Sequence, residues 1–254
     1  MNTAMRRALF GRSLFLQSCW NYERMQNIGF AYAIDPWLKR CYGEGAPLSL
    51  ARARHFDFFN TQPYMSGLIL GLVCALEEDA AAKPSDEAVV SRIRALKTAS
   101  ASALAGIGDA LFWATLRPLC AALAILFAAL AWPRLRAEAI LLGTLAYLAA
   151  FNAPAAYLRW KGLAWGYSWK EQIGVKLKSF PWQRWIGRLR LAGLGFTAAA
   201  AAAWYAAVPA RSLLEPSALV VFLTAKTALS SASTGRLYAG AVALGCLASF
   251  AGWL

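Results

Sequence analysis

A short stretch near the N-terminus concentrates polar side chains that could bind a sugar. In CWNYERMQNIGF, residues 19–30, amide and charged groups crowd into less than two helical turns. A helix over residues 14–33 would place Glu23 and Asn27, four residues apart, side by side. Sugar hydroxyls need both donors and acceptors, which amides and carboxylates supply together. A solvated or partner-facing side of an amphipathic helix would carry the same residues: Asn21, Glu23, Arg24, Gln26 and Asn27.

A second polar stretch, HFDFFNTQPY at residues 55–64, holds the only histidine of the chain, His55, and a further amide, Asn60. Two arginines and Asp57 surround His55 in the sequence, which favours an ordinary surface imidazole. No second histidine, catalytic serine motif or phosphate-binding G-x-x-x-x-G-K-[ST] loop accompanies it. We therefore expect no catalytic residue for phosphotransfer in this chain.

A third group, LAGIGDALFWATLRPL at residues 104–119, places Asp109 and Arg117 next to an apolar run. Two glycines precede Asp109, and they predict a backbone turn after which Asp109 caps the next helix. An ionisable residue at membrane depth is a functional candidate, because an unpaired charge there costs several kcal/mol. The alternative is structural: Asp109 caps the helix and pairs with Arg117.

The cysteines indicate neither a metal centre nor a disulfide framework. All five are scattered, without a C-x-x-C pair or a histidine-rich companion segment. We expect no metal ligands and no cofactor.

Composition indicates a membrane protein. Hydrophobic residues make up 59% of the chain and charged residues only 15%. The net charge of +13 is uneven: residues 1–109 hold 12 Lys and Arg against 10 Asp and Glu, whereas residues 110–254 hold 14 against 3. The basic residues of the second part lie between apolar runs, where such residues keep loops on the cytoplasmic side of a membrane. The basic excess therefore indicates membrane topology, and we expect no nucleic-acid partner.

These patterns predict an all-α integral membrane protein with two regions. Residues 1–109 are predicted to form amphipathic and re-entrant helices. Asp35-Pro36 is predicted to start one of them, and the short apolar run 64–76 is predicted to enter the membrane without crossing it. Residues 110–254 read as a transmembrane region of about five segments. The segments are placed at 110–131, 138–158, 191–208, 217–232 and 237–254.

The connection at residues 159–190 is predicted to be a cytoplasmic loop. It carries eight Lys and Arg against one acidic residue, together with several tryptophans typical of a membrane interface. Counting crossings from this loop places the N-terminal region on the cytoplasmic side and the C-terminus outside. We also expect no cleaved signal peptide, because Gly11-Arg12-Ser13 interrupts the first apolar run.

Several motifs together resemble a known family. SCWNYERMQNIGFAYAIDPWLKRCY, RHFDFFNTQPY, LAGIGDALFWATLRP and FNAPAAYLRWKGLAWGYSWKEQI follow one another in the chain. In that order they closely resemble landmarks of the enzyme IID component of mannose-family sugar phosphotransferase systems. The resemblance covers about residues 10–190, and the paired hydrophobic segments that follow fit the family's ending.

The resemblance implies a multi-pass subunit of the bacterial inner membrane that forms a sugar path with a IIC membrane partner. Phosphate would pass through histidines of separate cytoplasmic IIA and IIB proteins, so this chain would translocate and dock without being phosphorylated. Membrane lipids would be further partners, and the basic region 159–190 could receive IIB. On this basis the candidates for the sugar path or partner interface are Asn21, Glu23, Asn27 and Asn60, with Asp109 and Arg117 shaping the path.

The chain departs from the family pattern at three places. It has Gly108-Asp109-Ala110 where members carry Gly-Asp-Pro, Ser102-Ala103 where they carry Gly-Pro, and Gln62-Pro63 where they carry His-Pro. Losing two helix breakers predicts a straighter hairpin or a changed gate. It also leaves a second function open: a non-transporting membrane scaffold or regulatory paralogue of the same family.

Overall fold

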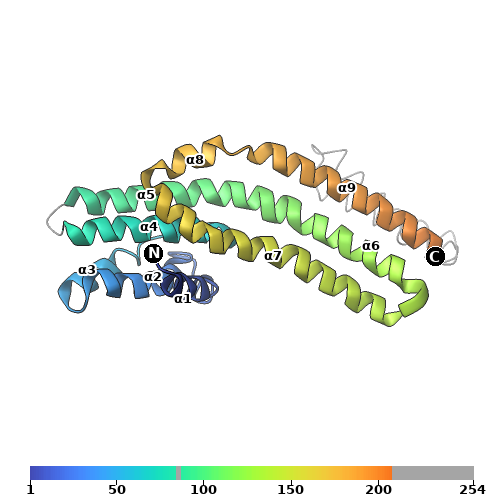
Figure 1. Cartoon of the computed structure of the whole chain (residues 1–254), viewed down its shortest axis with the longest axis horizontal. Coiled ribbons are helices and arrows are strands. Elements are labelled where there is room, and N and C mark those ends of the chain that lie inside the picture. Colours follow the sequence, from blue (N-terminus) through green and yellow to red (C-terminus); the bar gives the residue numbers. More distant parts are fainter. Residues whose placement is uncertain (84–86, 208–254) are drawn as a thin grey trace. The chain divides into compact units, whose positions relative to one another are not determined.

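The computed structural model describes residues 1–83 and 87–207, and these are helical with short connections (Figure 1). Two of the five expected membrane segments, 217–232 and 237–254, lie outside the described residues. The elements in chain order are α1 (Thr3–Ser13), α2 (Asn27–Tyr42), α3 (Ala46–Ala53), η1 (Pro63–Met65), α4 (Ser66–Ala82), α5 (Glu87–Gly108), the π-helix η2 (Asp109–Leu116), α6 (Arg117–Leu135), α7 (Ala137–Trp169), η3 (Lys170–Gln172), α8 (Ile173–Ser179) and α9 (Trp182–Ala207).

The chain divides into two compact units that are described separately. Unit 1 comprises Met1–Pro118 and Leu148–Leu191, and unit 2 comprises Leu119–Tyr147 and Ala192–Leu254. Two uninterrupted helical stretches, Glu87–Leu135 and Ala137–Ser179, are long and apolar enough to cross a membrane. Each stretch contributes residues to both units.

The core of unit 1 is built around α4. Its apolar side chains, including Ile69, Leu70, Leu72 and Val73, are fully buried. It packs against α2 and α5, which lies beside it in Figure 1. The run 64–76 that suggested a re-entrant element is thus part of a buried core helix.

Two glycine pairs let α4 and α7 approach each other at backbone distance. A Cβ atom at Gly67 or Gly71 would lie 2.1 or 2.2 Å from a carbonyl oxygen of α7, and one at Gly166 would lie 1.9 Å from the Leu68 oxygen. Gly162 makes a fourth close approach, 2.8 Å from the Leu68 nitrogen. Both helices therefore carry a G-x-x-x-G pair, the arrangement that allows close packing of membrane helices.

The predicted helix start at Asp35-Pro36 is wrong, because α2 continues through Pro36. Proline removes the hydrogen bond that would reach the carbonyl of Tyr32, one turn earlier. The Arg12 guanidinium of α1 donates to that carbonyl at 3.0 Å instead. Asp35 does not cap a helix but pairs with Arg52 at 2.7 Å and Lys39 at 3.5 Å.

The predicted turn at Gly106 and Gly108 is also wrong. Gly108 has ordinary right-handed helical angles, φ −68° and ψ −39°, and the helix runs from α5 through η2 into α6. The wider π-helical turns accommodate Pro118: the Arg117 N–H bonds the Phe112 carbonyl five residues back. The Thr115 hydroxyl donates to the carbonyl of Ala110 at 2.7 Å.

The expected loop at 159–190 is mostly helical as well. Arg159 is buried at the unit 1 end of α7, where its Nη1 donates to the Ser13 carbonyl at 3.2 Å and its Nη2 to the Pro63 carbonyl at 2.8 Å. Lys176, Lys178, Arg184 and Arg188 remain exposed on α8 and α9.

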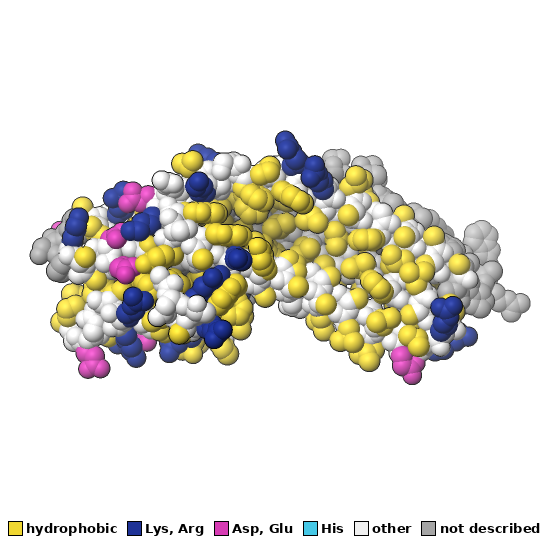
Figure 2. Space-filling model, in the orientation of Figure 1, with side chains coloured by type: hydrophobic (Ala, Val, Ile, Leu, Met, Phe, Trp, Pro, Cys, Tyr) yellow, Lys and Arg dark blue, Asp and Glu magenta, His cyan; other side chains and the backbone are white. Residues whose placement is uncertain are grey.

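In unit 2, residues 119–147 form an antiparallel helix pair (Figure 1). Arg136 alone separates α6 from α7 and adopts a left-handed φ of 49°. Gly143 allows close contact, since a Cβ there would lie 2.6 Å from the Ala124 carbonyl oxygen. The outward surface of this pair is apolar (Figure 2) and includes Ile125, Phe127, Leu130, Ile140, Leu141, Leu142 and Leu145.

Candidate functional site

Segment 54–62 of unit 1 contains no helix and runs beside residues 21–26. The Gln26 N–H donates to the Phe59 carbonyl at 2.8 Å, and the Phe59 N–H donates to the Arg24 carbonyl at 3.3 Å. An irregular backbone inside a helical protein needs such partners, because an unpaired buried peptide group costs as much as a lost hydrogen bond. The first two polar stretches of the sequence therefore meet in space.

Residues 21–25 form a tight turn, so the helix expected over 14–33 begins only at Asn27. Asn27 is buried, and its Nδ2 donates to the Phe56 carbonyl at 2.8 Å. Asn21 donates to the Asn27 amide oxygen at 3.3 Å. Glu23 faces solvent with 81% of its side chain exposed and pairs with Arg24 at 3.4 Å. The two asparagines thus hold segment 54–62, while Glu23 stays at the surface.

His55 is fully buried, which corrects the expectation of a surface imidazole. Its Nε2 lies 3.0 Å from Oε1 of Glu77, a buried carboxylate of α4. The Arg54 guanidinium pairs with the same carboxylate, and the Tyr42 hydroxyl donates to it at 2.8 Å. One acidic group of α4 therefore holds the start of segment 54–62.

Burial and hydrogen bonding set the charges of this cluster. Burial would raise the pKa of Glu77, but hydrogen bonds from Arg54 and His55 outweigh it and lower the pKa to about 2. Burial lowers the pKa of His55 to about 4. With Nε2 donating to Glu77, a second proton would sit on Nδ1, which is buried without a partner among the described residues. At neutral pH the cluster therefore contains an ionised Glu77 and a neutral His55.

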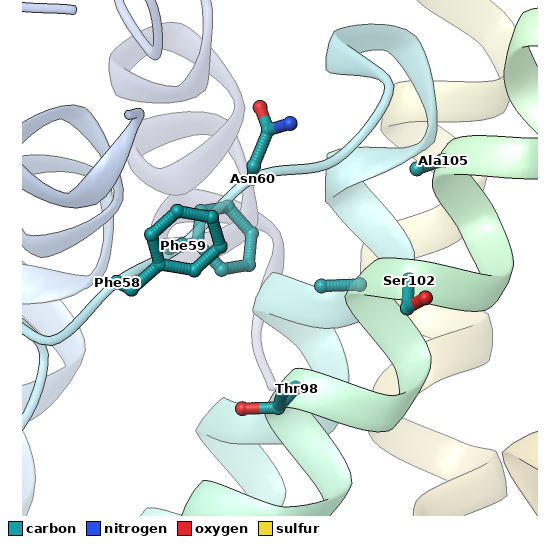
Figure 3. A pocket seen from close by; sticks show the side chains of 7 residues that line it. Phe58, Phe59, Asn60, Thr98, Ser102 and Ala105 are labelled. Carbon is teal, nitrogen blue, oxygen red and sulfur yellow. The ribbon is translucent and has the colours of Figure 1, made fainter. Parts of the chain in front are cut away.

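Asn60 lies at a small pocket between segment 54–62 and α5. Figure 3 shows Phe58, Phe59 and Asn60 on the extended segment, and Thr98, Ser102 and Ala105 on the helix opposite. The pocket measures about 230 Å³ and is open to the surface. That is below the roughly 300 Å³ of pockets that enclose drug-sized ligands, and because this pocket is open it would leave one side of a bound molecule uncovered.

Asp109 and Arg117 are both exposed on the continuous helix, and no ion pair joins them in the part of the chain that the structure describes. The Arg117 guanidinium lies 5.7 Å from the centre of the Trp113 ring. Gly108, the residue before Asp109, packs against segment 54–62: a Cβ there would lie 2.5 Å from Cβ of Gln62. Asp109 is thus near the pocket segment, whereas Arg117 lies two helical turns further on.

Sequence reasoning missed three residues that shape the site: Gln26, Glu77 and Arg159. Gln26 lies in the first polar stretch but is not among the sequence candidates, and Glu77 directly follows the apolar run 64–76. Arg159 was assigned to a loop, although the G-x-x-x-G spacing of Gly162 and Gly166 beside it was a signal for a buried helix. Within 1–83 and 87–207 no cluster of three or more His, Cys, Asp and Glu could hold a metal ion.

Comparison with known sequences identifies relatives over most of the chain. Residues 1–204 match the family described as PTS system mannose/fructose/sorbose family IID component. The mannose-specific EIID component of Escherichia coli K12 is 40% identical over 165 residues, 64% of this chain and 54% of that protein. The fructose permease IID component of Bacillus subtilis is 33% identical over 160 residues, 63% of this chain and 54% of that protein. The chain spans about half the length of the curated relatives it matches.

Two solved structures share the fold. One is a cryo-EM structure of the mannose transporter ManYZ in complex with microcin E492, with a TM-score of 0.59 and 27% identity. The other is described as a membrane protein and has a TM-score of 0.71 and 26% identity. Each match covers 99% of this chain and 97% of the other.

Proposed function

Because the chain belongs to the IID components of the mannose/fructose/sorbose family of sugar phosphotransferase systems, we propose that it forms a sugar path with a IIC partner. The sugar, a hexose or a related compound, would enter the cell to be phosphorylated by IIB, which IIA supplies with phosphate. The pocket at Asn60 supports this proposal most directly. It is lined by residues whose amide and hydroxyl groups suit sugar hydroxyls, and it is open to the surface, so a second subunit would complete it.

The six candidate residues take different parts in this proposal. Asn60 contacts the sugar, and Asp109 lines the path beside it. Asn21 and Asn27 hold segment 54–62 through the bonds described above. Glu23 and Arg117 are exposed and belong to the interface with IIC.

We place the chain in the bacterial inner membrane, where it crosses in about five segments. The N-terminal region and the basic stretch 159–190 lie on the cytoplasmic side, and the C-terminus lies outside. The exposed basic residues of α8 and α9 suit anionic lipid head groups and a cytoplasmic IIB partner. The apolar surface of residues 119–147 suits lipid or the IIC subunit.

The chain itself would carry no phosphate. His55 is the only histidine and is fully buried against Glu77, out of reach of a phosphocarrier protein. This burial supports a non-phosphorylated subunit whose role is translocation and docking.

The proposal is tested by uptake of radiolabelled mannose, fructose and sorbose in a host without its own mannose-family transporter. The chain is expressed together with IIC, IIB and IIA proteins of the same family. We expect uptake that depends on this chain and falls about ten-fold per assembled complex for Asp109→Asn, since the charged carboxylate that lines the path is lost. Glu44→Gln, an exposed control, leaves uptake unchanged.

A non-transporting scaffold is the second candidate, because Ala110 replaces the proline that the family pattern carries. Proline at this position would remove an N–H and crowd the carbonyl one turn earlier, bending the helix beside Asp109. If the assembled wild-type complex takes up none of the three sugars while Ala110→Pro does, the scaffold is the better description.

A further inference from the structure

We propose that Gln26 is a positioning residue that fixes the backbone on both sides of Asn60 and so holds the Asn60 amide in place at the rim of the pocket. This inference rests on the proposed function, in which Asn60 contacts the sugar. Gln26 itself does not line the pocket. It acts only through the segment that carries Asn60.

Three hydrogen bonds from Gln26 bracket Asn60. Before Asn60, the carbonyl of Phe59 accepts from the Gln26 N–H at 2.8 Å. After it, the N–H of Thr61 donates to Gln26 Oε1 at 3.1 Å, and the Thr61 carbonyl accepts from Gln26 Nε2 at 2.9 Å. One glutamine thus binds the residues on either side of Asn60, and its side chain mimics a strand by pairing with both backbone groups of Thr61.

The surroundings make these bonds strong and directional. Gln26 and Thr61 are 2% and 3% exposed, so water does not replace the bonds if they break. The Thr61 hydroxyl also donates to the Ala101 carbonyl of α5 at 3.1 Å. Ala101 lines the pocket on the opposite side from Asn60. The clamp therefore sets the distance between Asn60 and α5.

Among the residues that the structure describes, no hydrogen bond holds the Asn60 side chain, which is exposed at the rim of the pocket. Without Gln26, the peptide groups next to Asn60 could rotate and carry its amide away from the sugar. A catalytic or binding group must be held within a fraction of an ångström of its productive place. The expected consequence is weaker sugar binding with little change in the maximal transport rate.

The test uses Gln26→Met, which keeps the length of the side chain and removes both side-chain bonds. Gln26→Asn is a milder second variant, because it keeps an amide that is too short to reach both groups of Thr61. Gln17→Met is the matched control, since Gln17 is exposed. Uptake of the best of the three radiolabelled sugars is measured in the complete system and normalised to assembled IIC–IID complex.

We expect Gln26→Met to raise KM about ten-fold with a nearly unchanged maximal rate, the effect of about one lost hydrogen bond to the sugar. Gln26→Asn raises KM in the same direction, and Gln17→Met leaves it unchanged. A double-mutant cycle then separates positioning from stability. In an Asn60→Ala background, Gln26→Met adds nothing further to KM, because the group it positions is gone.

Other outcomes would overturn the inference. Effects of Gln26→Met and Asn60→Ala that multiply would show that Gln26 acts independently of Asn60. A loss of assembled complex with an unchanged KM would show a structural role only. If Asn60→Ala alone leaves KM unchanged while the wild-type chain supports uptake, both this inference and the role of Asn60 fail, but the transport function stands. If the wild-type chain supports no uptake, the role of Gln26, the role of Asn60 and the transport function all fail.

Discussion

Segment 54–62 and the helix pair formed by residues 119–147 keep their shapes by different interactions. The segment contains no helix, and buried polar side chains such as Gln26, Asn27 and Glu77 satisfy its backbone and fix its start. The helix pair satisfies its own backbone, contacts through small residues such as Gly143 and Ala124, and presents apolar side chains outward. The segment can therefore hold a polar side chain in a fixed place, whereas the pair presents an apolar surface.

The difference shows where substitutions should matter. Glu77, Gln26 and Asn27 are buried and hydrogen-bonded to specific partners in unit 1, so removing one member leaves another unpaired. On the outward face of residues 119–147 no single side chain has that role. The predictions below test this contrast, from the largest expected effect to the smallest.

Removing the charge of Glu77 should cost the most stability. Glu77→Gln leaves the buried guanidinium of Arg54 without its counter-charge, which should lower the free energy of unfolding by about 4 kcal/mol. Thermal unfolding of the detergent-purified chain measures the loss. Glu44→Gln, an exposed control, should leave the melting temperature unchanged; equal melting temperatures for both variants would refute the role of the cluster.

Adding a methyl group where α4 crosses α7 should have the second-largest effect on stability. In Gly166→Ala the new Cβ meets the backbone oxygen of Leu68, which cannot move without shifting α4, so we expect a loss of about 3 kcal/mol. Gly174→Ala is the matched control, because a Cβ there meets nothing within 4 Å. Unchanged thermal stability of Gly166→Ala would mean that the two helices lie further apart.

Acidification should destabilise unit 1 through His55. Folding lowers the pKa of His55 from about 6.5 in the unfolded chain to about 4. The contribution of neutral His55 to the free energy of unfolding is therefore complete above pH 6.5 and is lost as the pH falls towards 4. Between pH 7.5 and pH 5 the expected loss is about 2 kcal/mol. Glu77 contributes little in this window, because it stays ionised down to a pKa of about 2.

His55→Gln tests this pH dependence, since glutamine keeps a donor for Glu77 and does not titrate. Its melting temperature should change less between pH 7.5 and pH 5 than that of the wild type. The same pH dependence in both proteins would assign the effect to other groups.

The smallest effect is expected on the apolar surface of unit 2. Leu141 is 59% exposed, so Leu141→Ala should change the stability of the isolated chain in detergent by no more than about 0.5 kcal/mol. A loss comparable to that of Gly166→Ala would show that this surface is internally packed.

The sequence predicts the helical membrane class well, because long apolar runs depend only on local composition. Its candidates Asn60 and Asp109 lie on neighbouring segments of the structure, and their part in a sugar path stays a prediction. Prediction from the sequence fails where a residue far away in the chain determines the environment of a side chain. His55 looks exposed beside charged neighbours, but its partner Glu77 is 22 positions away in the chain.

The two predicted helix boundaries fail for the same physical reason. Pro36 would end α2 if the freed carbonyl of Tyr32 had no other donor, and Arg12 of another helix supplies one. Gly108 suggests a turn, but in the structure it lies within a helix, where its lack of a side chain leaves room for Gln62. Local signals for helix breaks were therefore present, and tertiary contacts overruled both.

The most direct measurement is sugar affinity of the purified IIC–IID complex, by isothermal titration with the sugar taken up best. The central claim is that segment 54–62 presents Asn60 to that sugar. We predict that Asn60→Ala weakens Kd about ten-fold, as expected for the loss of one polar contact, with the complex intact. An unchanged Kd in an intact complex would contradict the claim.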